Sequence, residues 1–152
     1  MTTEQLRHRM PPILKALKER SLRGRTPVEG LRRTECAYHG WDTVHADAAS
    51  WEPFAPGDAF GGLEAHHCFK GTVTLPEASA GKRVVCLVST GASDIWNKNN
   101  PQFLAYVDGR LVCGLDVNHN EFDLAACAVP GESHELALYV YCNTPARDVF
   151  LR

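Results

Sequence analysis

Three polar residues, Asp116, Asn118 and His119, follow an apolar run that ends at Leu115. A loop after a strand presents such side chains to ligands or to other domains. They are therefore candidates for a carbohydrate pocket or for a contact with a neighbouring domain. Asp and Asn also hydrogen-bond to the backbone of tight turns, which His119 would close. We favour the turn, and we rank a domain contact above direct sugar binding.

The three tryptophans, Trp41, Trp51 and Trp96, offer aromatic faces on which a sugar ring can stack. Trp96 lies in the polar stretch 93–100 and is the best candidate for this role. Large aromatic side chains more often anchor a core while the indole N–H stays hydrated. We therefore expect Trp41 and Trp51 to lie in the core.

Spacing that would suit catalysis or metal binding is missing from the sequence. His66 and His67 are adjacent, so on a strand they point to opposite faces and do not easily share one ion. A glycosidase needs two carboxylates that converge at about 5 to 9.5 Å across a cleft. Glu121 and Asp123 alternate on one predicted strand, where we expect them to be solvated. We predict no catalytic residue, no metal ligand and no cofactor site in this chain.

The six cysteines show no C-x-x-C spacing, which argues against a zinc knuckle and a thioredoxin-type site. Four of them lie among apolar residues, where free thiols behave as small buried hydrophobes: Cys86, Cys113, Cys127 and Cys142. The N-terminus lacks the apolar segment of a secretory signal. We therefore expect reduced core thiols and a cytoplasmic location.

The charge of the chain is divided unevenly. Residues 1–33 hold nine Lys or Arg against three Glu, whereas the whole chain of 152 residues has a net charge of −2. This basic arm has no aromatic residue for stacking on bases, so we expect a solvated helix face and no nucleic-acid partner. No apolar run approaches the roughly 18 residues that a membrane span needs, so we expect no membrane partner.

Residues 1–33 are predicted as a helical arm and linker, and residues 34–152 as one β-sandwich domain. Pro11-Pro12 should interrupt the helix, because neither residue offers an N–H and Pro12 disfavours helical geometry at Pro11. The segment 35–65 is aromatic and Gly-rich, and we expect it to lie extended across a sheet. It either contributes strands or leaves a sheet edge unpaired.

From Cys68 onward the pattern is that of β-structure. Asp108-Gly109 between apolar runs is the strongest hairpin signal. About six strands with no helical pattern between them predict an all-β fold, an antiparallel sandwich. They are expected at 69–75, 84–88, 103–107, 111–113, 122–124 and 136–140.

The stretch 100–121 carries a family resemblance, through the hairpin at Asp108-Gly109 and the sequence Gly114-Leu115-Asp116-x-Asn118-His119. It resembles the non-catalytic N-terminal domain of glycoside hydrolase family 38, the α-mannosidases. Shorter pieces agree in order, so the resemblance spans roughly residues 35 to 142. They include Trp51-x-x-Phe54 and the run Thr72-Val-Thr-Leu-Pro-Glu77.

The resemblance implies a galactose-binding-like jelly roll that precedes a separate catalytic domain. In that family the catalytic domain holds zinc through a His-x-Asp-x-x-Trp signature and retains configuration with an Asp nucleophile. Here His45, Asp47 and Trp51 miss that spacing by one residue, and the chain is too short for a catalytic domain. Zinc is therefore expected only in the catalytic domain, which this chain lacks.

The function implied is that of an accessory domain, inactive alone, in an α-mannosidase. It would pack on and orient the catalytic domain that hydrolyses α-mannosidic bonds, its partner in the same polypeptide. Carbohydrate and a second copy of the chain, associating through the arm, are further candidate partners. The alternative is a free-standing carbohydrate-binding module or lectin, in which Trp96, Asp116, Asn118 and His119 would contact sugar.

Overall fold

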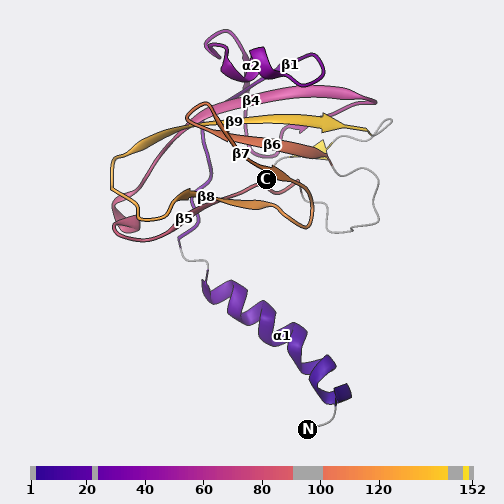
Figure 1. Ribbon diagram of the computed structural model, residues 1–152, viewed down its shortest axis with the longest axis vertical. Helices are drawn as coiled ribbons and strands as arrows, with labels where there is room; N and C mark the ends of the chain where they lie inside the picture. The colour runs from indigo at the N-terminus through magenta and orange to yellow at the C-terminus, as the bar shows by residue number, and fades with distance from the viewer. Residues whose placement is uncertain (1–2, 22–23, 91–100, 144–148, 151–152) are drawn as a thin grey trace.

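The computed structural model describes residues 3–21, 24–90, 101–143 and 149–150. It shows an antiparallel β-sandwich preceded by one long helix, α1 (Thr3–Ser21) (Figure 1). The predicted all-β sandwich with a helical N-terminal arm is therefore confirmed. None of the helices in the described ranges is long and apolar enough to cross a membrane.

A six-stranded sheet forms the larger layer, and all its neighbouring strands are antiparallel. Its ten-residue strands β4 and β9 lie at the centre and pair along their whole length. In spatial order the strands are β2 (Glu52–Phe54), β1 (Leu31–Glu35), β4 (Ala65–Thr74), β9 (Ser133–Cys142), β6 (Gln102–Val107) and β7 (Arg110–Leu115).

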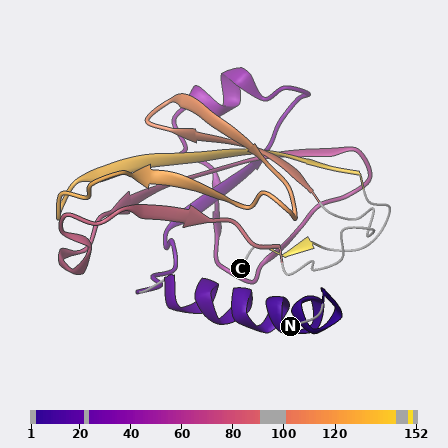
Figure 2. The same cartoon turned by 60° about the horizontal axis from the view of Figure 1, so that its bottom comes forward.

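The second layer is smaller. It consists of β5 (Val84–Leu87) paired with β8 (Glu121–Ala125), and it lies across one face of the large sheet (Figures 1 and 2). A short pair, β3 (Ala59–Phe60) with β10 (Val149–Phe150), lies beside these layers. The 3₁₀ turn η1 (Glu77–Ser79) leads from β4 towards β5. The outer face of the large sheet carries the short helix α2 (Trp41–His45).

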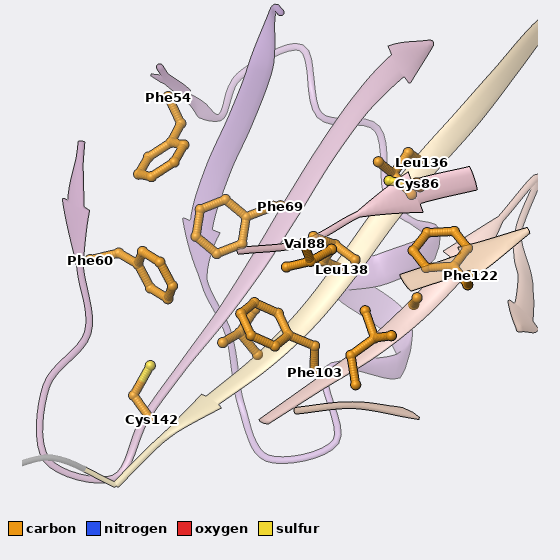
Figure 3. Close-up of a cluster of buried hydrophobic side chains, with 13 residues drawn as sticks. Phe54, Phe60, Phe69, Cys86, Val88, Phe103, Phe122, Leu136, Leu138 and Cys142 are labelled. Atoms are coloured by element: carbon orange, nitrogen blue, oxygen red, sulfur yellow. The ribbon is translucent and has the colours of Figure 1, made fainter. Parts of the chain in front are cut away.

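Phenylalanines dominate the core between the layers (Figure 3). Phe69 of β4 is fully buried, and its ring centre lies 4.8 Å from that of Phe54 and 4.9 Å from that of Phe60. On β9, Leu138 and Val140 face this core, whereas Tyr139 faces the outer side under α2. Both faces of the central strands are covered, which explains the nearly continuous apolar sequence of β9.

The predicted hairpin is present between β6 and β7. Asp108 and Gly109 both have positive φ, at 51° and 73°. A type I′ turn requires positive φ at both of its central residues, and Asp-Gly is a preferred pair for it. The turn lets β7 fold back on β6 at the edge of the large sheet.

The stretch predicted to be a linker differs from the prediction at its end, since Leu31–Glu35 forms β1, between β2 and β4. The predicted domain boundary at residues 33 and 34 falls within this strand. Gly24, Pro27 and Gly30 indicate a linker up to Arg33, but the strand begins directly after Gly30. Arg32 donates to the carbonyls of Ala49 and Trp51, and Arg33 donates to the carboxylate of Glu52.

The aromatic segment 35–65 supplies β2, β3 and α2. Of the two alternatives for this segment, the structure therefore supports the one in which it contributes strands. Trp51, predicted as a core anchor, is indeed buried, with 9% of its surface exposed.

The predicted interruption at Pro11-Pro12 is wrong, because α1 runs continuously through both prolines. Residues 3–17 are all exposed. The carbonyls that lose their partner N–H, four residues before each proline, lie on this exposed helix, where water can hydrogen-bond to them. The cost of proline in the helix is therefore reduced.

All six cysteines are free. Of the cysteines predicted to lie in the core, Cys86 and Cys142 are buried and Cys113 is half-buried; Cys68 is buried as well. Cys127 is exposed, so the prediction of a core position for it is wrong. It lies beyond the end of β8, where the chain leaves the sandwich interior for the turn that precedes β9.

Candidate functional site

The loop 116–120 follows β7 and is closed by its own first side chain. One carboxylate oxygen of Asp116 accepts from the backbone N–H groups of Asn118 and His119, each at 2.7 Å. The N–H of Asp116 donates in turn to the carbonyl of His119 at 2.9 Å. These backbone donors hold the pKa of Asp116 below its usual range. The structure therefore shows the tight turn that the spacing of Asp116, Asn118 and His119 favours.

The same loop leaves two polar side chains directed to solvent. The side chain of His119 is 83% exposed, and its Nδ1 lies 3.4 Å from a carboxylate oxygen of Asp116. Asn118 is exposed beside it. The loop thus holds a fixed shape through Asp116 and offers Asn118 and His119 for contact with another molecule or domain.

A small hollow lies next to the loop, and Asp116 forms part of its wall. Its volume is about 20 Å³, room for about one water molecule and too little to enclose a sugar ring. Its lining mixes apolar and polar residues: Val88, Ser89, Thr90, Pro101, Phe103, Leu115, Asp116, Val117 and Asn120. The prediction that Trp96 stacks on sugar falls in the stretch 91–100, which lies outside the described residues.

Two aromatic side chains on the outer face were not expected there. Trp41 is 59% exposed and Tyr38 is 71% exposed, so the predicted core position of Trp41 is wrong. Trp41 is the first residue of α2, and its ring centre lies 4.4 Å from that of His45 one turn later. Segment 35–65 has no periodicity from which to separate Trp41 from the buried Trp51. Gly40, with a φ of 49°, precedes α2 in the structure, and no pattern in the sequence indicates that Trp41 is exposed.

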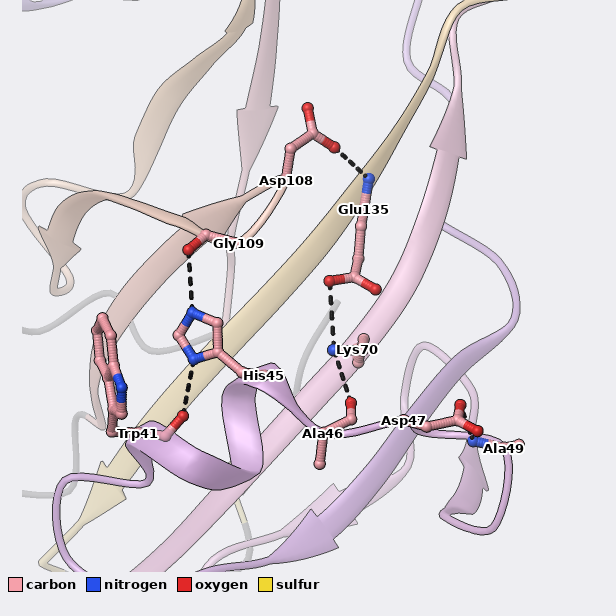
Figure 4. Close-up of polar contacts among 9 residues, drawn as sticks. All are labelled: Trp41, His45, Ala46, Asp47, Ala49, Lys70, Asp108, Gly109 and Glu135. Atoms are coloured by element: carbon pink, nitrogen blue, oxygen red, sulfur yellow. Dashed lines mark hydrogen bonds and ion pairs between the residues drawn. The ribbon is translucent and has the colours of Figure 1, made fainter.

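His45 connects α2 to the hairpin turn (Figure 4). Its Nδ1 lies 2.8 Å from the carbonyl oxygen of Trp41, and its Nε2 lies 3.0 Å from that of Gly109. Carbonyl oxygens only accept, so both ring nitrogens donate when the imidazole is protonated. These two carbonyls raise the pKa of His45 above its usual value.

Lys70 and Glu135 extend this network across the outer face of the sheet (Figure 4). The ammonium of Lys70, which is 7% exposed, donates to the carbonyl of Ala46 at 2.8 Å and lies 3.2 Å from the Glu135 carboxylate. The N–H of Glu135 donates to the Asp108 carboxylate at 2.9 Å. Asp108 also lies 2.9 Å from His134, and these contacts lower its pKa. The Asp108-Gly109 turn is therefore held from both β9 and α2.

His66 and His67 point to opposite faces of β4, as predicted. His66 is hydrogen-bonded to the hydroxyl of Tyr139 at 2.7 Å on the outer face. His67 is 3% exposed on the inner side, with its ring centre 5.8 Å from that of Phe60, and burial lowers its pKa. Within the described part of the chain, no three His, Cys, Asp or Glu residues converge to hold a metal ion.

Glu121 and Asp123 are both exposed on β8, as expected for solvated carboxylates. Asp123 forms an ion pair with Arg83, whose Nε donates to it at 2.7 Å. This ion pair gives Asp123 a partner on the surface.

Comparison with known protein families finds no match, and comparison with curated proteins finds none either. Among solved structures, the chain is similar to the beta-glucuronidase of Faecalibacterium prausnitzii, with a TM-score of 0.46 and 19% sequence identity. The similarity covers 80% of this chain and 22% of that protein, so the chain spans about a fifth of the length of its structural neighbour. A likeness this distant identifies neither a family nor an activity.

Proposed function

We propose that this chain is the non-catalytic N-terminal domain of a family 38 α-mannosidase. Its work would be to pack on and orient a separate zinc-dependent catalytic domain that hydrolyses α-mannosidic bonds. The observation that carries the proposal is the loop 116–120. In that loop the Asp116 carboxylate accepts hydrogen bonds from the backbone, while the side chains of Asn118 and His119 remain exposed.

A loop of this kind suits a lasting contact between domains. Because Asp116 already fixes the backbone, the loop loses little conformational freedom when a partner covers it. Val117, half-buried on the wall of the neighbouring hollow, adds apolar surface that a second domain can bury. His119 and Asn118 supply donors and acceptors at the rim of that surface.

Zinc would belong to the catalytic domain. The described residues here do not fit a zinc site, because no set of three ligating side chains converges among them. No step of the hydrolysis is therefore assigned to a residue of this chain.

The direct test mixes this chain with a separately produced family 38 catalytic domain in a calorimeter. We expect saturable association, weakened about tenfold by His119→Ala if one contact of roughly 1.4 kcal/mol is lost. His8→Ala on the exposed face of α1 is the matched control. The chain alone should leave nitrophenyl mannoside intact, with or without added Zn²⁺. Turnover by the chain alone, or equal binding by wild type and His119→Ala, would contradict the proposal.

A free-standing carbohydrate-binding module is the second candidate. The exposed rings of Trp41 and Tyr38 favour it, since aromatic faces stack on sugar rings. Titration of mannose and mannobiose decides between the two functions. Saturable binding that is lost in Trp96→Ala or Trp41→Ala would support the module, and no heat of binding would support the accessory domain.

We also propose that copies of the chain associate through the helical arm. Leu6, Met10, Ile13 and Leu17 recur at helical spacing on α1, and each is at least 40% exposed. A second α1 would cover these side chains. Light scattering after size exclusion should show a dimer that becomes a monomer when residues 1–23 are deleted.

A further inference from the structure

Two cysteines that are distant in the sequence lie side by side on the outer face of the large sheet. Cys36 directly follows β1, and its N–H donates to the carbonyl of His66 at 3.0 Å. Cys68 belongs to β4 and pairs with Thr34 in the register of the two strands. The two Sγ atoms are 3.4 Å apart, with the Cys68 thiol donating to Cys36.

The turn between β1 and α2 makes room for these sulfurs. Gly40 lies over them, and a Cβ at this position would be 3.2 Å from the Cys36 Sγ and 2.5 Å from Cδ2 of Tyr139. Cys68 is fully buried, whereas Cys36 is half-buried and reaches solvent. One thiol of the pair is therefore accessible and its neighbour is shielded.

The contact between the thiols shifts their pKa values in opposite directions. The hydrogen bond from Cys68 lowers the pKa of Cys36, and the same contact together with burial raises the pKa of Cys68. An accessible thiol with a lowered pKa next to a second thiol is the arrangement of reactive, oxidation-sensitive cysteines. Cys86 and Cys142 provide the contrast, because burial raises the pKa of each to about 11.

We propose that Cys36 and Cys68 form a peroxide-sensitive thiol pair that closes to an intramolecular disulfide. The Sγ–Sγ distance must fall from 3.4 Å to about 2.05 Å. Cys36 lies beyond the last residue of β1, so the segment 36–40 takes up this movement while β4 stays in the sheet. The inference goes beyond the proposed function and does not depend on it.

The chemistry needs only a hydroperoxide as the oxidant. The Cys36 thiolate attacks one oxygen of hydrogen peroxide, the O–O bond breaks, and a sulfenic acid and hydroxide result. The Cys68 sulfur then attacks the Cys36 sulfur, the S–O bond breaks, and the leaving hydroxide takes the Cys68 proton to become water. Overall, two thiols and one hydrogen peroxide give one disulfide and two waters.

Mass spectrometry of the full chain tests this step. A protease that cleaves after glutamate separates the two cysteines, because Glu35, Glu52 and Glu64 divide the sequence into peptide 36–52 and a peptide that begins at residue 65. After hydrogen peroxide treatment and alkylation, the two peptides should remain joined until a reductant is added. During the peroxide treatment, Cys36 should lose its reactivity towards the alkylating reagent about tenfold faster than Cys86, because little of the Cys86 thiol is ionised.

Three variants make the outcome decisive. Cys36→Ser removes the half-exposed partner and should abolish the link, and Cys68→Ser should do the same. Cys127→Ser removes an exposed thiol and should leave the link unchanged. Oxidation of Cys36 to sulfinic acid without a link, or crosslinking of two chains while Cys36 and Cys68 stay alkylatable, would overturn the proposal.

Discussion

Gly40 is the position at which a single methyl group should do the most damage to the outer face. Its φ of 49° is left-handed, and a Cβ there would lie 2.5 Å from the ring of Tyr139. The left-handed conformation costs an alanine about 1–2 kcal/mol. Forcing the buried ring aside adds about 1–3 kcal/mol, the usual cost of overpacking. We expect Gly40→Ala to lower the free energy of unfolding by about 2–5 kcal/mol in total.

Gly81→Ala is the matched control for this prediction. Gly81 has a φ of 68°, and nothing lies within 4 Å of a Cβ placed there, so alanine meets only the conformational cost. Urea and thermal unfolding of both variants isolate the steric part, about 1–3 kcal/mol. At about 2–4 °C per kcal/mol for a chain of this size, Gly40→Ala should melt well below Gly81→Ala. Equal melting temperatures would refute the close packing between Gly40 and Tyr139.

Three further predictions concern the contacts of His45, the core and the loop 116–120. Because the pKa of His45 is raised in the folded protein, the stabilisation by its protonated ring is complete below the unfolded pKa of about 6.5 and is lost as pH rises through the folded pKa. In urea titrations, His45→Gln should therefore lower the free energy of unfolding more at about pH 5.5 than at about pH 8.5. Phe69→Ala removes a fully buried ring and should cost about 3–5 kcal/mol by thermal unfolding, whereas a cost below about 1 kcal/mol would contradict the core assignment. Asp116→Ala leaves two backbone N–H groups without their acceptor and should cost about 1 kcal/mol at neutral pH; because the pKa of Asp116 is lowered, this difference should vanish as acidification protonates the carboxylate.

Short-range patterns in the sequence were sufficient to predict the sandwich. Alternation located β4, β8 and β9, and the apolar run before Asp108-Gly109 located β6. Asp108-Gly109 predicted the hairpin because few other residue pairs adopt positive φ at both positions. The turn closed by Asp116 was predictable for the same reason, as it depends only on neighbours in the chain.

Features that depend on distant parts of the chain were beyond sequence reasoning. The glycines and proline before β1 indicate a linker, and β1 is a strand only because β2 and β4 pair with it and Arg32 donates to the carbonyl of Trp51. Trp41 and Trp51 lie in the same aromatic segment of the sequence, and only the fold makes Trp41 exposed and Trp51 buried. The contact between Cys36 and Cys68 requires the register between β1 and β4, which no local spacing reveals.

The stretch that carries the family resemblance divides into two parts with different physical roles. The hairpin turn is engaged within the domain: Gly109 accepts from His45, and Asp108 accepts from the N–H of Glu135. The loop that follows directs His119 to solvent, where no contact of that strength holds it. Substitution of Asp108 should therefore lower stability, whereas substitution of His119 should leave stability nearly unchanged and affect only the binding of a partner. A stability loss at His119 equal to that at Asp108 would mean that the loop, too, serves the fold alone.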